Sequence, residues 1–133
     1  MTIKEMYGCE YIHSEDELFP LQKWYNNVID KSVEKLSIAD VLRMIRQDEF
    51  IDIAIPKAID FLMQNPFAGE LYEGELFGKI AHFSDALICK YYGALQQIVS
   101  DGLAKNEEHD WMTEEERIEF RELLNVFRRD FGR

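Results

Sequence analysis

Residues 50–64, FIDIAIPKAIDFLMQ, form the segment on which the fold prediction rests. Apolar side chains occur around much of its helical circumference, which is typical of a helix that is buried on most sides. Pro56 stands inside the segment and either begins its main part or kinks it. Asn65-Pro66 follows and predicts the end of the helix, because the residue before a proline is disfavoured in the α region. We therefore expect a central helix over residues 50–64.

Helix-start signals also stand in the part of the chain that precedes this helix. Pro20 suits a first helical turn, since its missing N–H would have no intrahelical partner there, and apolar residues recur at helical spacing from there to residue 36. Ser37 with Asp40 three residues later resembles a capping box. Residues 1–19 lack such a pattern and are expected to form an irregular or partly helical arm.

The second half of the chain is expected to hold three helices. One covers about residues 75–82, and one runs from a cap at Ser84 to a C-terminal glycine at Gly102. A polar loop over residues 103–112 follows, and a capping box at residues 113–116 starts the last helix. The apolar stripe of that helix, the clearest in the chain, consists of Phe120, Leu123, Leu124, Phe127 and Phe131.

The fold class follows from this pattern. No run alternates with period two, so the sequence predicts an all-α, compact bundle of about five to six helices. A chain of 133 residues suits one domain over residues 1–133, and its 47% apolar content can supply a core without a disulfide or a metal. The two cysteines form no CxxC pair.

The net charge of the chain limits the classes of molecule that it is expected to bind. Asp and Glu number 26 against 15 Lys and Arg, which gives a net charge of −11. A field of this sign repels nucleic acid and anionic lipid and attracts basic surfaces, although solubility alone is a common reason for an acidic composition. No stretch approaches the roughly 18 apolar residues of a membrane span, and no secretory signal opens the chain. We expect a cytoplasmic protein that binds neither nucleic acid nor membrane directly.

Residues 65–77, NPFAGELYEGELF, offer the first candidate site, with Glu70, Glu73 and Glu75 close together. A catalytic pair of carboxylates would need a pKa shifted by burial or by a like charge. The alternative is a solvated turn between helices, in which Gly69 and Gly74 take positive φ. In that turn, the side chains expected to anchor the loop in the core are Leu71, Tyr72 and Phe77.

The second candidate site surrounds Trp111, which we expect to be an exposed aromatic residue in an acidic patch. Between residues 107 and 122 there are eight acidic residues and only two arginines. The three histidines lack HExxH or paired Cys/His spacing, and no nucleotide-binding or nucleophile motif occurs. We predict no catalytic residue, no cofactor and no metal site, and hence no enzyme.

Two runs within residues 36–80, LSIADVLRMIRQ and IPKAIDFLMQNPFAGELYEGELF, resemble the family of contact-dependent growth inhibition immunity proteins. The N-terminal TIKEMYG is similar to the opening of that family. The matching residues are Leu36, Ser37, Asp40, Val41, Met44, Ile45, Gln47, Ile55, Pro56, Ala58, Leu62, Asn65, Pro66, Ala68, Gly69, Tyr72, Gly74, Glu75 and Leu76.

The resemblance implies a cytoplasmic antidote that binds the C-terminal toxin domain of a delivered effector, often a nuclease, and blocks it. The matching residues have the character of caps, a helix end and a glycine loop, so no site residue is taken from the family. Charge and aromatic content instead select the expected partner-binding residues: Glu70, Tyr72, Glu73, Glu75, Asp110, Trp111, Glu114, Glu115, Glu119 and Glu122. Two alternatives remain, an acidic adaptor or inhibitor of another host protein and a carboxylate-dependent enzyme.

Overall fold

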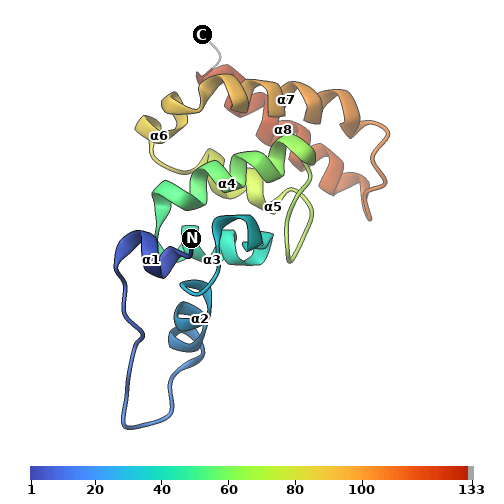
Figure 1. The fold of residues 1–133 in the computed structure, drawn as a ribbon. Helices are drawn as coiled ribbons and strands as arrows, with labels where there is room; N and C mark the ends of the chain where they lie inside the picture. Colours follow the sequence, from blue (N-terminus) through green and yellow to red (C-terminus); the bar gives the residue numbers. More distant parts are fainter. Residues whose placement is uncertain (132–133) are drawn as a thin grey trace.

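The computed structural model describes the backbone of residues 1–131 and the side chains of residues 1–130. In this range the chain forms eight α-helices, one short 3-10 helix and no strand, so the all-α prediction is confirmed. The helices are α1 Ile3–Tyr7, α2 Pro20–Val28, α3 Ile38–Gln47, α4 Ile51–Gln64, α5 Glu75–Ala81, α6 Asp85–Lys90, α7 Tyr92–Asn106 and α8 Glu114–Phe131, with the 3-10 helix η1 at Val33–Lys35 (Figure 1).

The number of helices exceeds the expected five to six for two reasons. The N-terminal arm contains α1, which Thr2 caps through a capping box with Glu5. The helix expected after Ser84 is two helices, because the backbone leaves the α region at Tyr91 (φ −108°, ψ 21°). Neither proline nor glycine occupies that position, so the sequence carries no signal for the break.

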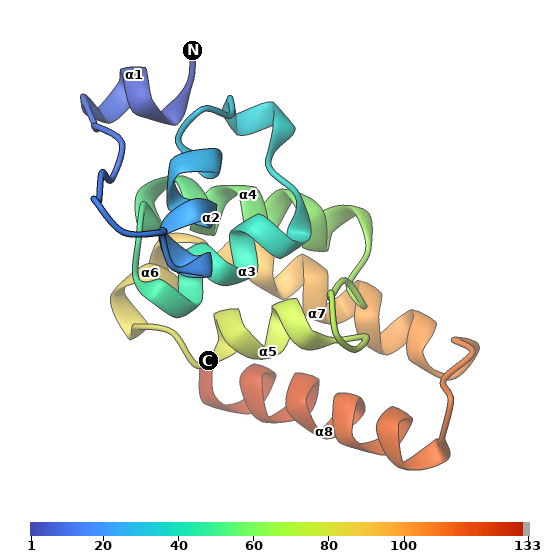
Figure 2. The same ribbon diagram turned by 90° about the horizontal axis from the view of Figure 1, so that it is seen from below.

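Helix α4 lies at the centre of the fold, as predicted, and contacts α3, α5 and α7. It continues through Pro56 and ends at Gln64, with Asn65 as its C-cap, and its buried residues are Ile53, Ala54, Ile55, Ala58, Ile59 and Leu62. In Figure 1, α7 and α8 lie on one side of α4, and α3 with the N-terminal segments lies on the other. Figure 2 shows α5 running beside α8. The expectation of a single domain over residues 1–133 stays a prediction.

Gly102 does not end a helix, contrary to expectation, and lies buried inside α7, which continues to Asn106. A Cβ atom at this position would lie 2.9 Å from Leu124 Cδ1, so the missing side chain lets α7 and α8 approach closely. The polar loop expected over residues 103–112 is correspondingly shorter. In α8, Phe120, Leu124 and Phe127 are buried as predicted, while the side chain of Phe131 lies outside the described residues.

Helix α2 is also shorter than expected and ends at Val28, so the apolar residues at positions 33 and 36 belong to η1 and its C-cap. The next helix start is confirmed, because Ser37 and Asp40 form a complete capping box at α3. Asp40 Oδ2 accepts hydrogen bonds from the N–H of Ser37 at 3.1 Å and from Lys31 Nζ at 2.7 Å. Burial alone would raise the pKa of Asp40, but Lys31 and Ser37 together lower it below its ordinary value.

Replacing Asp40 with Asn should lower the free energy of unfolding by about 1–2 kcal/mol at neutral pH, because a cap and a charge-assisted hydrogen bond are lost. The folded-state pKa of Asp40 lies below its unfolded value of about 3.9, so its contribution is complete above that pH. It is lost as the pH falls through the folded-state pKa. Urea titrations should therefore show a difference between wild type and Asp40→Asn that shrinks below about pH 4. The exposed Asp60→Asn is the matched control, and an equal effect of both substitutions would contradict the assignment.

Candidate partner-binding site

Glu75 is buried, with an exposed fraction of 2%, and is not the solvated carboxylate that the sequence suggested. Its Oε1 atom accepts hydrogen bonds from the N–H groups of Glu70 at 2.9 Å and Leu71 at 3.0 Å. A carboxylate that leaves water must be compensated by donors, and here the loop backbone supplies them. Glu75 therefore holds the loop 65–74 in place, and its carboxylate is occupied by the chain itself.

The two glycines of this loop have different roles. Gly74 takes a positive φ of 86° as expected, whereas Gly69 does not have a positive φ, contrary to expectation. A Cβ atom at position 69 would lie only 2.0 Å from the carbonyl oxygen of Tyr72, so Gly69 is needed for a close backbone approach. At position 74 a Cβ atom would lie 2.8 Å from the Phe120 ring. Both glycines thus let the loop fold tightly against its surroundings.

The loop is anchored by side chains other than those predicted. Phe77 is buried as expected, but Leu71 and Tyr72 are 74% and 56% exposed. Phe67, which the sequence analysis missed, is the main anchor: its ring stacks on His109 at 3.9 Å between centroids and lies 5.3 Å from the ring of Phe120. Its position directly after the helix-ending Asn65-Pro66 is the only sequence signal for this role. The exposed Tyr72 consequently belongs to the surface of the molecule.

Trp111 is buried with an exposed fraction of 8%, so the expectation of an exposed aromatic residue is wrong. Its ring lies 5.5 Å from that of Phe67, in an edge-on arrangement, and 5.4 Å from that of Phe120. Its indole N–H donates to Asn106 Oδ1 at 2.8 Å, and Asn106 is itself buried. A buried indole is stable only with an acceptor, which the acidic sequence around Trp111 did not reveal.

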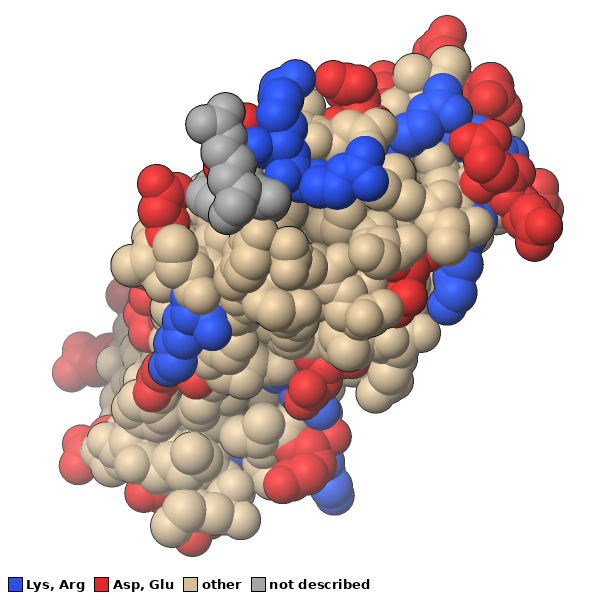
Figure 3. Space-filling model, turned by 90° about the horizontal axis from the view of Figure 1, so that it is seen from above, with Lys and Arg blue, Asp and Glu red and all other residues tan. Residues whose placement is uncertain are grey.

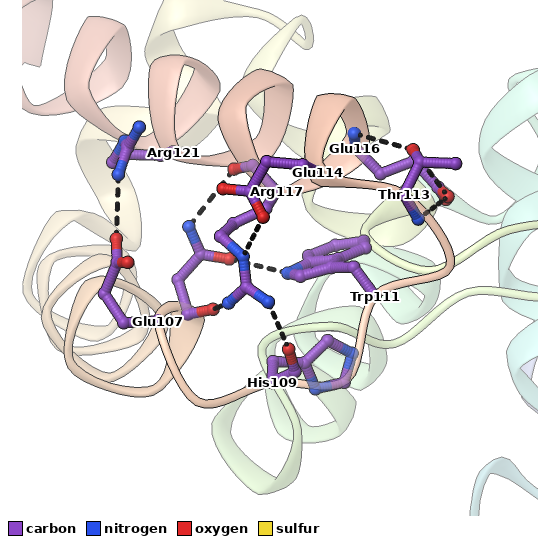
Figure 4. A network of polar contacts seen from close by, with 9 residues as sticks. Glu107, His109, Trp111, Thr113, Glu114, Glu116, Arg117 and Arg121 are labelled. Atoms are coloured by element: carbon purple, nitrogen blue, oxygen red, sulfur yellow. Dashed lines mark hydrogen bonds and ion pairs between the residues drawn. The ribbon is translucent and has the colours of Figure 1, made fainter.

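Arg117 joins this arrangement from α8 (Figure 4). Its guanidinium donates to the carbonyl oxygens of Asn106 and, at 3.0 Å, His109, and its Nε atom donates to Glu114 at 3.1 Å. Asn106 Nδ2 returns a hydrogen bond to the carbonyl oxygen of Arg117 at 3.2 Å. These contacts close the connection between α7 and α8. Sequence reasoning counted Arg117 only as a charge.

The capping box of the last helix is present as predicted, since Glu116 accepts from the N–H and the hydroxyl of Thr113. On the same side of the molecule, the loop comes against α8. Tyr72 and Glu73 from the loop line one hollow of about 150 Å³ together with Trp111, Glu116 and Glu119. The structure thus brings parts of the two candidate sites together, although they are about 40 residues apart in the sequence.

The remaining candidate residues lie around this hollow or close to it in sequence, and all are exposed: Glu70, Asp110, Glu114, Glu115 and Glu122. Glu114 is paired with Arg117. Glu73 Oε2 lies 3.0 Å from Nε2 of His109, but the two atoms lack hydrogen-bond alignment. Figure 3 shows acidic side chains gathered at its right-hand end, where Figure 1 places the α7–α8 connection, whereas the middle of that face is largely uncharged.

Over the described residues, no group of three or more His, Cys, Asp or Glu side chains is arranged to hold a metal ion. No helix in that part of the chain is both long enough and apolar enough to cross a bilayer. The arrangement as a whole is a rigid aromatic and hydrogen-bonded base beneath exposed carboxylates. Such a surface can bind a basic partner by charge and shape.

The chain matches a known protein family. Residues 5–98 match the family of CDI immunity proteins, and the chain belongs to that family. The matched range includes the loop 65–77 and ends within α7, so Trp111 and α8 lie beyond it. The comparison with curated proteins finds no match. Family membership supports an immunity role against a CDI toxin.

Replacing Glu75 with Ala should lower the free energy of unfolding by about 2–3 kcal/mol, because two backbone N–H groups lose their acceptor. Glu70→Ala removes an exposed carboxylate from the same loop and should change it by less than about 0.5 kcal/mol. Chemical denaturation followed by tryptophan fluorescence measures both values. Equal stability of the two variants would show that the Glu75 carboxylate does not hold the loop.

Arg117→Met keeps much of the alkyl stem and removes the guanidinium, so the carbonyl oxygen of the buried Asn106 loses its donor and that of His109 keeps only the N–H of Trp111. We expect a loss of about 2–3 kcal/mol of unfolding free energy, with faster amide hydrogen exchange in residues 106–113. Arg121, which pairs with Glu107 at the surface, provides the matched control. Arg121→Met should cost less than about 1 kcal/mol. Comparable losses in both variants would argue against the role of Arg117.

Proposed function

We propose that the protein neutralises the C-terminal toxin domain of a CDI effector by stoichiometric binding, that this toxin is a nuclease, and that the complex forms in the cytoplasm. The observation that carries the proposal is the family match over residues 5–98, which favours a toxin over any other host protein as partner. The proposed mode of action is occupation of the toxin surface, with no chemical step on the side of the immunity protein.

A nuclease is the proposed toxin because its chemistry suits this chain. An enzyme that cleaves nucleic acid presents basic groups to the phosphates of its substrate. A protein with a net charge of −11 complements such a surface. Opposite charges also accelerate association, and an antidote benefits from binding before damage accumulates.

The proposed contact surface consists of the loop 70–73 and the exposed first half of α8. The burial of Glu75 assigns it a supporting role beneath this surface rather than a direct contact, and Trp111 can meet a partner only through the hollow that it lines. A catalytic use of the loop carboxylates is disfavoured for the same reason, because Glu75 already serves two backbone N–H groups. The residues proposed to meet the toxin are Glu70, Tyr72, Glu73, Asp110, Glu114, Glu115, Glu119 and Glu122.

The test uses the toxin domain encoded by the reading frame next to that of this protein. Calorimetric titration should give one immunity protein per toxin domain, and nuclease activity should fall to zero at equimolar addition. Complete inhibition at a small fraction of one equivalent would indicate a catalytic mode of action and would contradict the proposal. Absence of binding would contradict it as well.

Salt dependence tests the electrostatic part of the proposal separately. The association rate with the toxin domain should fall about tenfold or more between about 0.1 M and 1 M salt, where the Debye length shrinks from about 10 Å to about 3 Å. Stopped-flow fluorescence measures the rate. An association rate that is independent of salt would rule out steering by the acidic surface.

A further inference from the structure

The hollow between the loop and α8 is walled mainly by acidic and aromatic side chains. Three carboxylates, from Glu73, Glu116 and Glu119, line it together with three aromatic side chains, and no lysine, arginine or histidine does. The aromatic residues are Tyr72, Trp111 and Phe120. A depression with these walls favours a cation that carries apolar or planar surface.

The carboxylates of the hollow differ in how far the protein already uses them. One oxygen of Glu116 accepts from Thr113, and Glu73 lies beside His109. Glu119 is exposed and makes no ion pair or side-chain hydrogen bond with any described residue. The hollow therefore contains at least one carboxylate that the fold does not neutralise.

The walls of the hollow are fixed before any partner arrives. Trp111 is held by Asn106, and Glu116 by the capping box. Gly74 brings the loop backbone against the Phe120 ring, where a Cβ atom would lie 2.8 Å from Cδ1. Tyr72, at 56% exposure, is the one aromatic wall that faces solvent broadly. A preorganised receptor of this kind loses little conformational entropy on binding.

The size of the hollow limits its occupant. Its volume is about 150 Å³, whereas sites for drug-sized ligands measure about 300 to 1,000 Å³. It suits the end of one side chain. A guanidinium is planar, stacks on aromatic rings, is weakly hydrated and pairs with carboxylates through two parallel N–H groups, so arginine fits these walls better than the compact, strongly hydrated ammonium of lysine.

We propose that this hollow, walled by Tyr72, Trp111 and Phe120 and by Glu73, Glu116 and Glu119, receives one arginine side chain of the toxin domain. The inference rests on the proposed function, since it names the group of the partner that the acidic surface engages. The arginine end lies against the aromatic walls, and Glu119 supplies the free carboxylate. The other exposed acids act on the approach of the toxin more than on the lifetime of the complex.

Glu119→Gln and Glu108→Gln test this assignment with the toxin domain. Both variants remove one exposed negative charge from the same end of the chain, but only Glu119 lines the hollow. We expect Glu119→Gln to weaken toxin affinity about tenfold, mainly through faster dissociation, and Glu108→Gln to change the dissociation rate less than about twofold. Similar dissociation rates in the two variants would overturn the arginine pocket while leaving the proposed function intact.

A second measurement does not require the toxin. The chain has two tryptophans, so the indole N–H signals of Trp111 and Trp24 can be followed by NMR while N-acetyl-arginine amide is added. The Trp111 signal should shift at millimolar concentration, and Glu119→Gln, but not Glu108→Gln, should reduce that shift. N-acetyl-lysine amide should shift Trp111 less. An unmoved Trp111 signal, or an equal or larger effect of the lysine probe, would overturn the assignment to arginine. Failure of the wild-type protein to bind the toxin at all would overturn the proposed function, and with it the toxin as the source of the arginine.

Discussion

The carboxylate of Glu75 is the constraint from which the candidate site is built. A charge that leaves water is costly unless donors surround it, and the donors here are two N–H groups of the loop that precedes it. The loop must therefore turn back on itself, which explains why position 69 tolerates no side chain. Glu75 also stands in the first turn of α5, where the helix dipole favours a negative charge. Tyr72 and Glu73 lie between Glu75 and the N–H groups that it binds, and both are exposed at the surface.

At this end of the molecule, buried polar groups stabilise the fold, and exposed carboxylates form the charged surface. Asn106, Arg117 and Trp111 satisfy one another within the α7–α8 connection, so these polar atoms have partners inside the protein. The carboxylates outside this network face solvent and make the surface negatively charged. The family match covers the loop wall of the hollow, whereas the wall on α8 lies beyond the matched residues. One wall thus comes from the part of the chain that resembles its family, and the other does not.

Local chemistry made much of the fold predictable. Ser37, Ser84 and Thr113 were recognisable as helix caps because each bonds to a residue three positions later. The central helix 50–64 was recognisable from the apolar residues around its own circumference. The failures at Trp111 and Gly102 depend on distant partners. Nothing near Trp111 in the sequence announces Phe67, against which its ring packs, and nothing near Gly102 announces Leu124 on another helix. The acidic character of the site was visible in the sequence, but its base of buried groups arises only from tertiary contacts.

Gly102 lies behind the hollow and affects how closely the elements around the hollow pack. A side chain at this position would meet Leu124 of α8 on one side and Pro66, at the start of the loop, on the other. A Cβ atom here would lie 2.9 Å from Leu124 Cδ1, so the Leu124 side chain would have to shift, whereas Pro66 Cβ at 3.6 Å would be in ordinary contact. The packing of α8 behind the hollow therefore depends on a residue that a partner in the hollow does not touch.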